Sequence, residues 1–125
     1  MKIQALKYDF AICKIKSITT NLLNNKFCFI GKTDEEISLV CPIDAIPNNI
    51  DTVNSGWRAF RISGELDFSL IGIIAEISAL LAQNDISIFA VSTFNTDYFL
   101  VKCEKFNLAL SVLESVGYEI EYKFV

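Results

Sequence analysis

After residue 56, the spacing of the apolar residues changes in an order that limits the folds open to this chain. Phe60 and Ile62 alternate with polar residues, as in a half-buried strand. Apolar residues then recur at helical spacing over 70–81 and again over 106–116. Further strands with period two are predicted over 86–93, 97–103 and 118–124. The order β-α-β-β-α-β predicts a ferredoxin-like unit of class α+β, with two helices on one face of an antiparallel sheet.

The beginning of the chain repeats part of this pattern and predicts a shorter copy of the same unit. Alternating apolar residues predict a strand over 6–12, and two further strands flank the polar hairpin loop 31–36. Before that hairpin there is room only for a short helix, which Ser17 is suited to cap and Leu22 and Leu23 to dock. The order is therefore β-α-β-β, followed by a loop.

The segment 42–56 is the predicted connector, because it carries both prolines, three asparagines and a glycine. We therefore expect a truncated first unit over residues 1–55 and a second unit over 56–125. Neither segment is long enough to bury a good core alone, so the two units are expected to be fused. Trp57, which follows the connector, is the expected core anchor between them.

Composition excludes several classes of function. Histidine is absent from the 125 residues, which removes Ser-His and Cys-His catalysis and histidine-ligated metals. A net charge of −4 disfavours a nucleic-acid surface, and the longest apolar concentration is shorter than the roughly 20 residues that cross a membrane. The start of the chain has no apolar signal core, so we expect a cytoplasmic protein. No cofactor and no metal site are predicted.

The four cysteines do not form a recognisable motif. They are widely spaced, without a CxxC pair, and each lies in an apolar stretch, which favours buried reduced thiols. No cluster of carboxylates, lysines or thiols is placed to activate a nucleophile, so we expect no enzyme. A small enzyme with a cysteine nucleophile stays open as an alternative. The residues concerned are Cys13, Cys28, Cys41 and Cys103.

The turn between the strands 86–93 and 97–103 is the most informative candidate site. Two hydroxyl residues, Ser92 and Thr93, end the first strand, and Phe94 stands at the tip. Backbone amides and Thr93 are suited to a ligand carboxylate, and Asp97 to an ammonium or guanidinium group. The alternative is a solvated hairpin in which Thr96 and Asp97 only stabilise the turn.

The loop 63–69 enters the first long helix and is a second candidate. The free N–H groups of a helix N-terminus suit an anion, although Asp67 or Ser69 is equally suited to cap the helix. Arg58 and Arg61 lie on one strand, where surface salt bridges explain them. The acidic run 34–36 is expected at a solvated hairpin tip, with too few converging oxygen ligands for a metal.

Residues 57–102, WRAFRISGELDFSLIGIIAEISALLAQNDISIFAVSTFNTDYFLVK, resemble the core of small bacterial tandem ACT-domain proteins. These proteins are similar to the CASTOR-type cytosolic arginine sensors of animals, and the likeness extends upstream through FCFIGKTDEEISLVCPIDAIP. The resemblance implies two tandem ferredoxin-like ACT units, the first truncated, with an amino acid bound at a domain or subunit interface. The ligand-binding residues implied are Thr93, Phe94 and Asp97 with Ser92, an opposite wall of Asp67, Phe68 and Leu70, and Asp51 and Thr52 from the other unit.

One departure from the arginine sensors bears on the ligand. Asp67 and Leu70 stand where those sensors have a glycine and a glutamate, so a charged partner for an arginine side chain is missing. A smaller or more apolar amino acid, or an empty pocket retained for folding, is then open. We expect a non-enzymatic, allosteric sensor in which the ligand shifts the packing of units or protomers. The alternative is a ligand-free module that forms homodimers edge to edge and binds a regulated protein partner.

Overall fold

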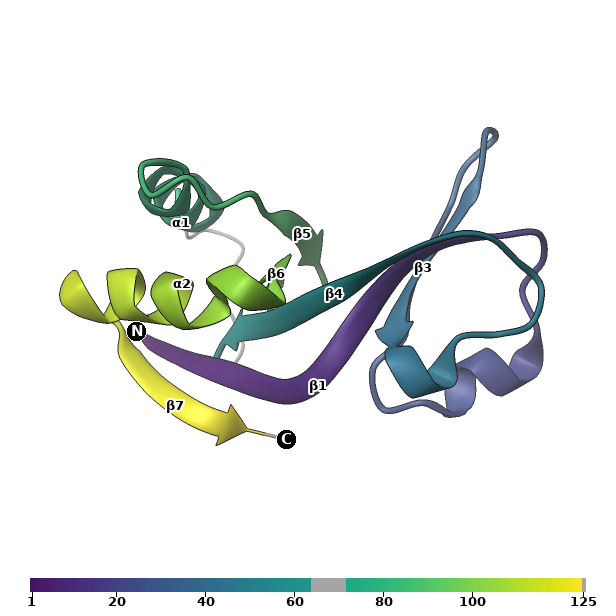
Figure 1. Cartoon of the computed structure of the whole chain (residues 1–125), viewed down its shortest axis with the longest axis horizontal. Helices are drawn as coiled ribbons and strands as arrows, with labels where there is room; N and C mark the ends of the chain where they lie inside the picture. Colours follow the sequence, from purple (N-terminus) through teal and green to yellow (C-terminus); the bar gives the residue numbers. More distant parts are fainter. Residues whose placement is uncertain (64–71, 125) are drawn as a thin grey trace. The chain divides into compact units, whose positions relative to one another are not determined.

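The computed structural model describes residues 1–63 and 72–124 (Figure 1). It contains two compact units. The large unit comprises Met1–Tyr8 together with Arg58–Val125, and the small unit comprises Asp9–Trp57. Two long strands, β1 (Lys2–Ile15) and β4 (Ile50–Ile62), each contribute one half to each unit.

This grouping differs from the predicted segments 1–55 and 56–125, because the first eight residues belong with the carboxyl-terminal part. The reason is the length of β1, whose beginning pairs with the last strand, Lys2 with Glu119 and Ile3 with Ile120. Periodicity locates a strand but does not name its neighbours. That the chain carries two tandem ACT units stays a prediction.

The large unit confirms the predicted order of elements. After β4 come α1 (Ile73–Ala82), β5 (Phe89–Ser92), β6 (Asp97–Lys102), α2 (Cys103–Ser115) and β7 (Glu119–Phe124). The neighbours in its sheet are β7, β1, β4, β6 and β5 in that order. The expectation of an antiparallel sheet is wrong for one pair, since β7 runs parallel to the additional strand β1.

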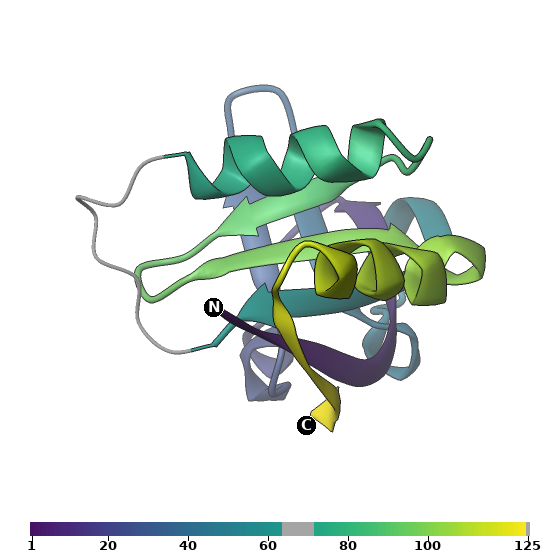
Figure 2. The same cartoon turned by 90° about the vertical axis from the view of Figure 1, so that its left-hand side faces the viewer.

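Both helices of the large unit pack on one face of its strands, the side that faces the viewer in Figure 2. Side chains from α1, such as Ile77 and Leu81, and from α2, such as Leu110, meet this face in a single buried core. At its centre the Phe60 and Phe99 rings are stacked with their centroids 5.2 Å apart. The helical periodicity therefore identified the faces that the fold buries.

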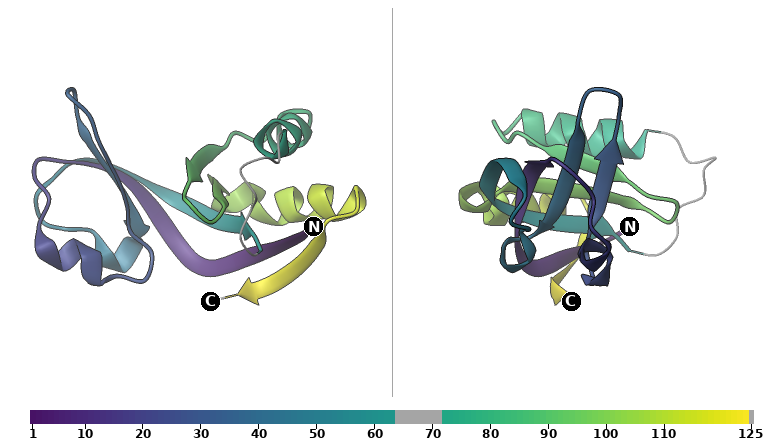
Figure 3. Two further views of the ribbon diagram at one scale, coloured as in Figure 1. Left: turned by 180° about the vertical axis from the view of Figure 1, so that it is seen from behind. Right: turned by 90° about the vertical axis from the view of Figure 1, so that its right-hand side faces the viewer.

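The small unit contains β2 (Phe29–Lys32) and β3 (Ile37–Pro42), which lie between β1 and β4 in the sequence (Figure 3). In the sheet, β3 pairs antiparallel with β1, and β2 pairs with the other side of β3. The small unit also contains two 3-10 turns, η1 (Thr20–Asn24) and η2 (Ile43–Ala45). Its core is small and is formed by Ala11, Cys13, Ile15, Leu22, Leu39 and Cys41.

Two predictions for the small unit are corrected. Thr19, rather than Ser17, is the residue before η1, and the Ser17 hydroxyl accepts a hydrogen bond from Asn49. Leu22 docks as predicted, but Leu23 is exposed. The connector over 42–56 is also shorter than predicted, because β4 already begins at Ile50. Residues 50–56 are all exposed, so no apolar alternation marked them as strand.

The ends of the helices agree with the sequence where the structure describes them. Asn84 and Asp85 follow α1, and Gly117 ends α2 with a φ of 106°, a conformation that suits glycine. The predicted caps Asp67 and Ser69 lie outside the described residues; α1 is preceded by Gly72. Within residues 1–63 and 72–124, none of the helices has the length and apolar character needed to cross a membrane.

Candidate functional site

The β5–β6 turn is held by hydrogen bonds between its own first and last residues. The backbone N–H of Thr93 donates to the Thr96 carbonyl at 2.9 Å. The Thr93 hydroxyl donates to the same carbonyl at 2.8 Å and accepts from the Thr96 N–H at 3.3 Å. The Thr93 hydroxyl therefore already helps to stabilise the turn. This agrees with the alternative interpretation of the segment as a stabilised hairpin.

Thr96 anchors this turn to the neighbouring strand. Its side chain is only 6% exposed, and its hydroxyl donates to the Ile62 carbonyl of β4 at 3.0 Å. This residue fixes where β6 begins, because the anchored position lies directly before Asp97. The sequence places Thr96 in the turn, but no local signal reveals this long-range bond.

Asp97 opens β6 and pairs across the ladder with Ser92, so the two side chains share one face of the sheet. Side chains alternate along a strand, which puts Asp97 on the same face as Phe99, the face that the helices cover. Asp97 is half-buried, and within the described residues its carboxylate has no hydrogen-bond or ion-pair partner. Such a carboxylate is suited to a positively charged ligand group.

Phe94 is at the tip of the turn and is 72% exposed. The structure therefore brings Ser92, Thr93, Phe94 and Asp97 together on one hairpin of the large unit. Nothing is described that tests the other predicted site residues against this hairpin. Asp67, Phe68 and Leu70 lie outside the described residues, and Asp51 and Thr52 are exposed residues of the small unit.

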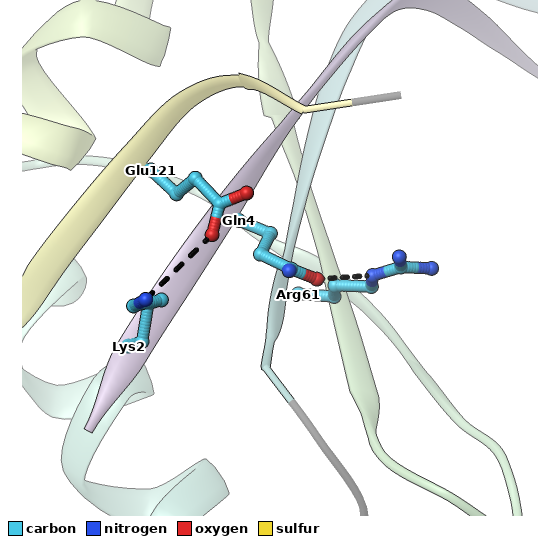
Figure 4. A network of polar contacts seen from close by, with 4 residues as sticks. All are labelled: Lys2, Gln4, Arg61 and Glu121. Atoms are coloured by element: carbon cyan, nitrogen blue, oxygen red, sulfur yellow. Dashed lines mark hydrogen bonds and ion pairs between the residues drawn. The ribbon is translucent and has the colours of Figure 1, made fainter.

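An arginine network lies behind the turn, on the opposite face of the sheet. Arg61 of β4 donates through Nε to Gln4 of β1 and through Nη1 to the Tyr98 hydroxyl of β6, each at 2.9 Å. Figure 4 shows the Gln4 contact beside the ion pair between Lys2 and Glu121, whose Nζ and Oε1 atoms are 3.9 Å apart. Gln4 was missed in the sequence because a single glutamine in a strand carries no signal. The network ties Tyr98, the residue after Asp97, to the central strands.

Arg58 corrects the prediction that both arginines form surface salt bridges. Its guanidinium donates to the Leu6 carbonyl at 2.8 Å and stacks over the Phe106 ring, 4.2 Å from the centroid. Among the described residues, Arg58 forms no ion pair, and its Nε is buried without a hydrogen-bond partner. Arg58 therefore joins β1, β4 and α2 as a structural residue of the large unit.

The cysteines are all free; Cys13 and Cys41 are buried as predicted, and Cys28 is half-buried. Burial raises the pKa of Cys13 and Cys28, and it raises the pKa of Cys41 to about 12, with smaller contributions from the neighbouring Cys13 and Cys28. A raised pKa disfavours the nucleophilic thiolate. The prediction is wrong for Cys103, which is exposed at the start of α2.

The acidic segment 34–36 is exposed at the tip of the β2–β3 hairpin, as predicted. Across residues 1–63 and 72–124, no three side chains among histidine, cysteine, aspartate and glutamate converge in a way that would hold a metal ion. The β5–β6 turn is thus the predicted site whose described residues come together.

Comparisons with known proteins agree with this fold. The family model described as "ACT domain" matches residues 52–115. The cytosolic arginine sensor for mTORC1 subunit 1 from mouse is 38% identical over 84 residues, which are 65% of this chain and 24% of the sensor. The human sensor is 42% identical over 66 residues, covering 50% of this chain and 20% of that protein. The chain thus spans about a quarter or less of these relatives.

Solved structures extend the likeness to almost the whole chain. A crystal structure of a protein from Agrobacterium tumefaciens is 30% identical, with a TM-score of 0.87 over 99% of this chain and 94% of that one. Aspartate kinase from Clostridium acetobutylicum shares the fold at 14% identity, with a TM-score of 0.67 over 90% of this chain and 33% of the kinase. The matched residues 52–115 include the whole β5–β6 turn. This chain belongs to the ACT-domain family.

Proposed function

We propose that this chain is a non-enzymatic regulatory module that binds a small amino acid at the β5–β6 turn. ACT domains are regulatory modules that bind small molecules, and the arginine sensors similar to this chain suggest an amino acid as ligand. The observation that carries the proposal is the half-buried Asp97 carboxylate, which has no partner among the described residues. Thr96 holds this carboxylate at a fixed point on the sheet through its bond to Ile62.

The groups around Asp97 suggest how an amino acid is oriented. The carboxylate receives the ligand's ammonium group, and the Ser92 hydroxyl beside it on the same face is available for a second polar contact. Phe94 supplies an exposed apolar surface at the tip of the turn. Thr93 contributes by shaping the turn, because its hydroxyl is already bonded to Thr96.

A thermal-shift screen with the twenty amino acids tests this proposal. A ligand present at one hundred times its Kd stabilises the folded protein by about 2.7 kcal/mol, which raises the Tm by several degrees. In Asp97→Asn the side chain keeps its size but loses its charge. We expect its affinity for the responding amino acid to fall about tenfold to a hundredfold, the usual effect of losing a charge-assisted hydrogen bond.

Asp34→Asn is the matched control, since it removes the same charge from the tip of the other hairpin. It should leave the affinity unchanged. The absence of a thermal shift with every amino acid, or an equal loss of affinity in both variants, would contradict the proposal.

The alternative of a ligand-free interaction module rests on β5, an edge strand whose four residues, FAVS, carry no charge. The mass in solution, recorded by light scattering in the same experiment, tests it, and a strict monomer counts against it.

A further inference from the structure

A cavity of about 300 Å³ lies in the large unit where α2 turns into β7, next to the first turn of α1. It shares no residue with the β5–β6 turn. Its volume is at the lower end of those that hold small molecules in proteins. The lining residues are Met1, Ile73, Glu76, Val116, Gly117 and Tyr118.

The backbone at the end of α2 shapes this cavity. Gly117 adopts a φ of 106°, and the Tyr118 N–H then donates back to the Leu113 carbonyl at 3.1 Å. This turn directs Tyr118 into the core, where it is 8% exposed. The next N–H, of Glu119, donates to the Met1 carbonyl at 3.0 Å and brings the start of β1 to the cavity. Three separate parts of the chain therefore meet at this point.

Glu76, an exposed residue of α1, contributes a carboxylate to the cavity lining. The Tyr118 hydroxyl donates to Oε1 of Glu76 at 2.6 Å. Burial, followed by the hydrogen bond to Glu76 and its charge, raises the pKa of Tyr118 to about 12, so the phenol remains a neutral donor near neutral pH. Within the described residues, Glu76 forms no ion pair. Its second oxygen is available to a ligand, while its first is held in place.

The remaining walls combine aliphatic side chains with polar backbone atoms. Met1 also carries the α-ammonium group, which forms no ion pair with Glu76 within the described residues. Val116 and Met1 are each 52% exposed, and Ile73 lies one helical turn before Glu76, so its side chain is on the same side of α1. An anion would be repelled by Glu76, and a bare inorganic cation would leave these apolar walls in contact with water. A group that is both positively charged and aliphatic satisfies both parts of the lining.

We propose that this cavity binds a small organic cation, a primary ammonium group on a short aliphatic stem, with Glu76 as its counter-ion. Tyr118 orients the carboxylate, and Ile73, Val116 and Met1 cover the stem. This is a second site that goes beyond the amino-acid site at Asp97 and does not depend on it.

Titration of the full chain with n-butylammonium chloride, followed by NMR chemical shifts, tests the proposal. Sodium chloride at the same ionic strength is the reference, and n-butanol provides the same stem without the charge. We expect saturable shifts at α1 and at residues 116–118 with the amine only. Glu76→Gln keeps a carbonyl oxygen that accepts from Tyr118 but removes the charge, and should weaken binding at least tenfold.

A second glutamate–tyrosine pair in the same unit supplies the control. The Tyr122 hydroxyl donates to Glu114 at 3.5 Å on the exposed surface, outside the cavity. Glu114→Gln should therefore not change the affinity for the amine, while Tyr118→Phe should weaken it a few-fold by releasing the carboxylate. Unsaturable shifts, equal binding of n-butanol, or the same loss in Glu114→Gln and Glu76→Gln would overturn the proposal.

Discussion

Two hairpins of the described structure, β2–β3 and β5–β6, have the same turn at positions sixty residues apart. Lys32 pairs with Ile37 in one, as Ser92 pairs with Asp97 in the other. In both turns a threonine hydroxyl accepts a hydrogen bond from the backbone N–H three residues later. Thr33 accepts from Glu36, and Thr93 accepts from Thr96. The local chemistry of a threonine-initiated turn thus suffices to build each of them.

The last position of the turn is where the hairpins differ. Thr96 is buried and donates to the Ile62 carbonyl, whereas Glu36 is exposed and its carboxylate only accepts from Ser38. The following residue is Asp97 in one hairpin and Ile37 in the other. The two turns have the same internal hydrogen bonds, so these bonds do not make the β5–β6 turn a candidate binding site. What distinguishes it is the buried bond from Thr96 to Ile62 and the carboxylate of Asp97 that follows.

The largest expected effect compares the cores beneath the hairpins at equivalent positions, Phe99 and Leu39, both fully buried. Phe99→Ala should lower the free energy of unfolding by about 4 kcal/mol and Leu39→Ala by about 3 kcal/mol, as large-to-small core substitutions do. Phe99→Ala should destabilise the protein more, because it also removes the stacking of Phe99 on Phe60. Urea unfolding of both variants measures the difference, and a larger loss for Leu39→Ala would reverse the comparison.

Replacement of Thr96, which anchors the β5–β6 turn to β4, should have an intermediate effect on the free energy of unfolding. Thr96→Val should cost about 1–2 kcal/mol, because the buried Ile62 carbonyl loses its hydroxyl donor. Thr96→Ser should recover most of that loss, since it restores the hydroxyl. Glu36→Gln on the other hairpin should change stability by no more than about 0.5 kcal/mol. Equal urea midpoints for Thr96→Val and Glu36→Gln would show that the anchor does not distinguish the two turns.

The smallest effect concerns the threonines that begin the turns. Thr33→Val and Thr93→Val should each cost about 0.5–1 kcal/mol, because each removes a side-chain acceptor within an exposed turn. The loss of stability should be slightly greater for Thr93→Val, because the Thr93 hydroxyl lies 2.8 Å from the Thr96 carbonyl oxygen. The Thr33 hydroxyl lies 3.5 Å from the Glu36 carbonyl oxygen. Amide hydrogen exchange at Thr96 and Glu36 checks this order. Unchanged exchange in either variant would show that the backbone alone holds that turn.

Periodicity predicted the large unit well, since both helices and three of its strands lie where the apolar spacing put them. It failed where a strand is exposed on both sides. Residues 50–56 of β4 lack any apolar alternation and are held through backbone pairing, so they were predicted to be a connector. The candidate site was predicted in part: the residues of the β5–β6 turn are adjacent in sequence, and a turn brings adjacent residues together.

The sequence by itself determined the class of fold, the order of the elements in the large unit and the hairpin that carries Asp97, because these depend on local spacing and turn chemistry. Only the tertiary structure decided which segments are partners. It paired the start of β1 with β7, fixed Thr96 on Ile62, and brought Tyr118 to Glu76 across 42 positions of the chain. Long-range pairs of this kind depend on the packing of a whole core, and no local pattern encodes which two residues will meet.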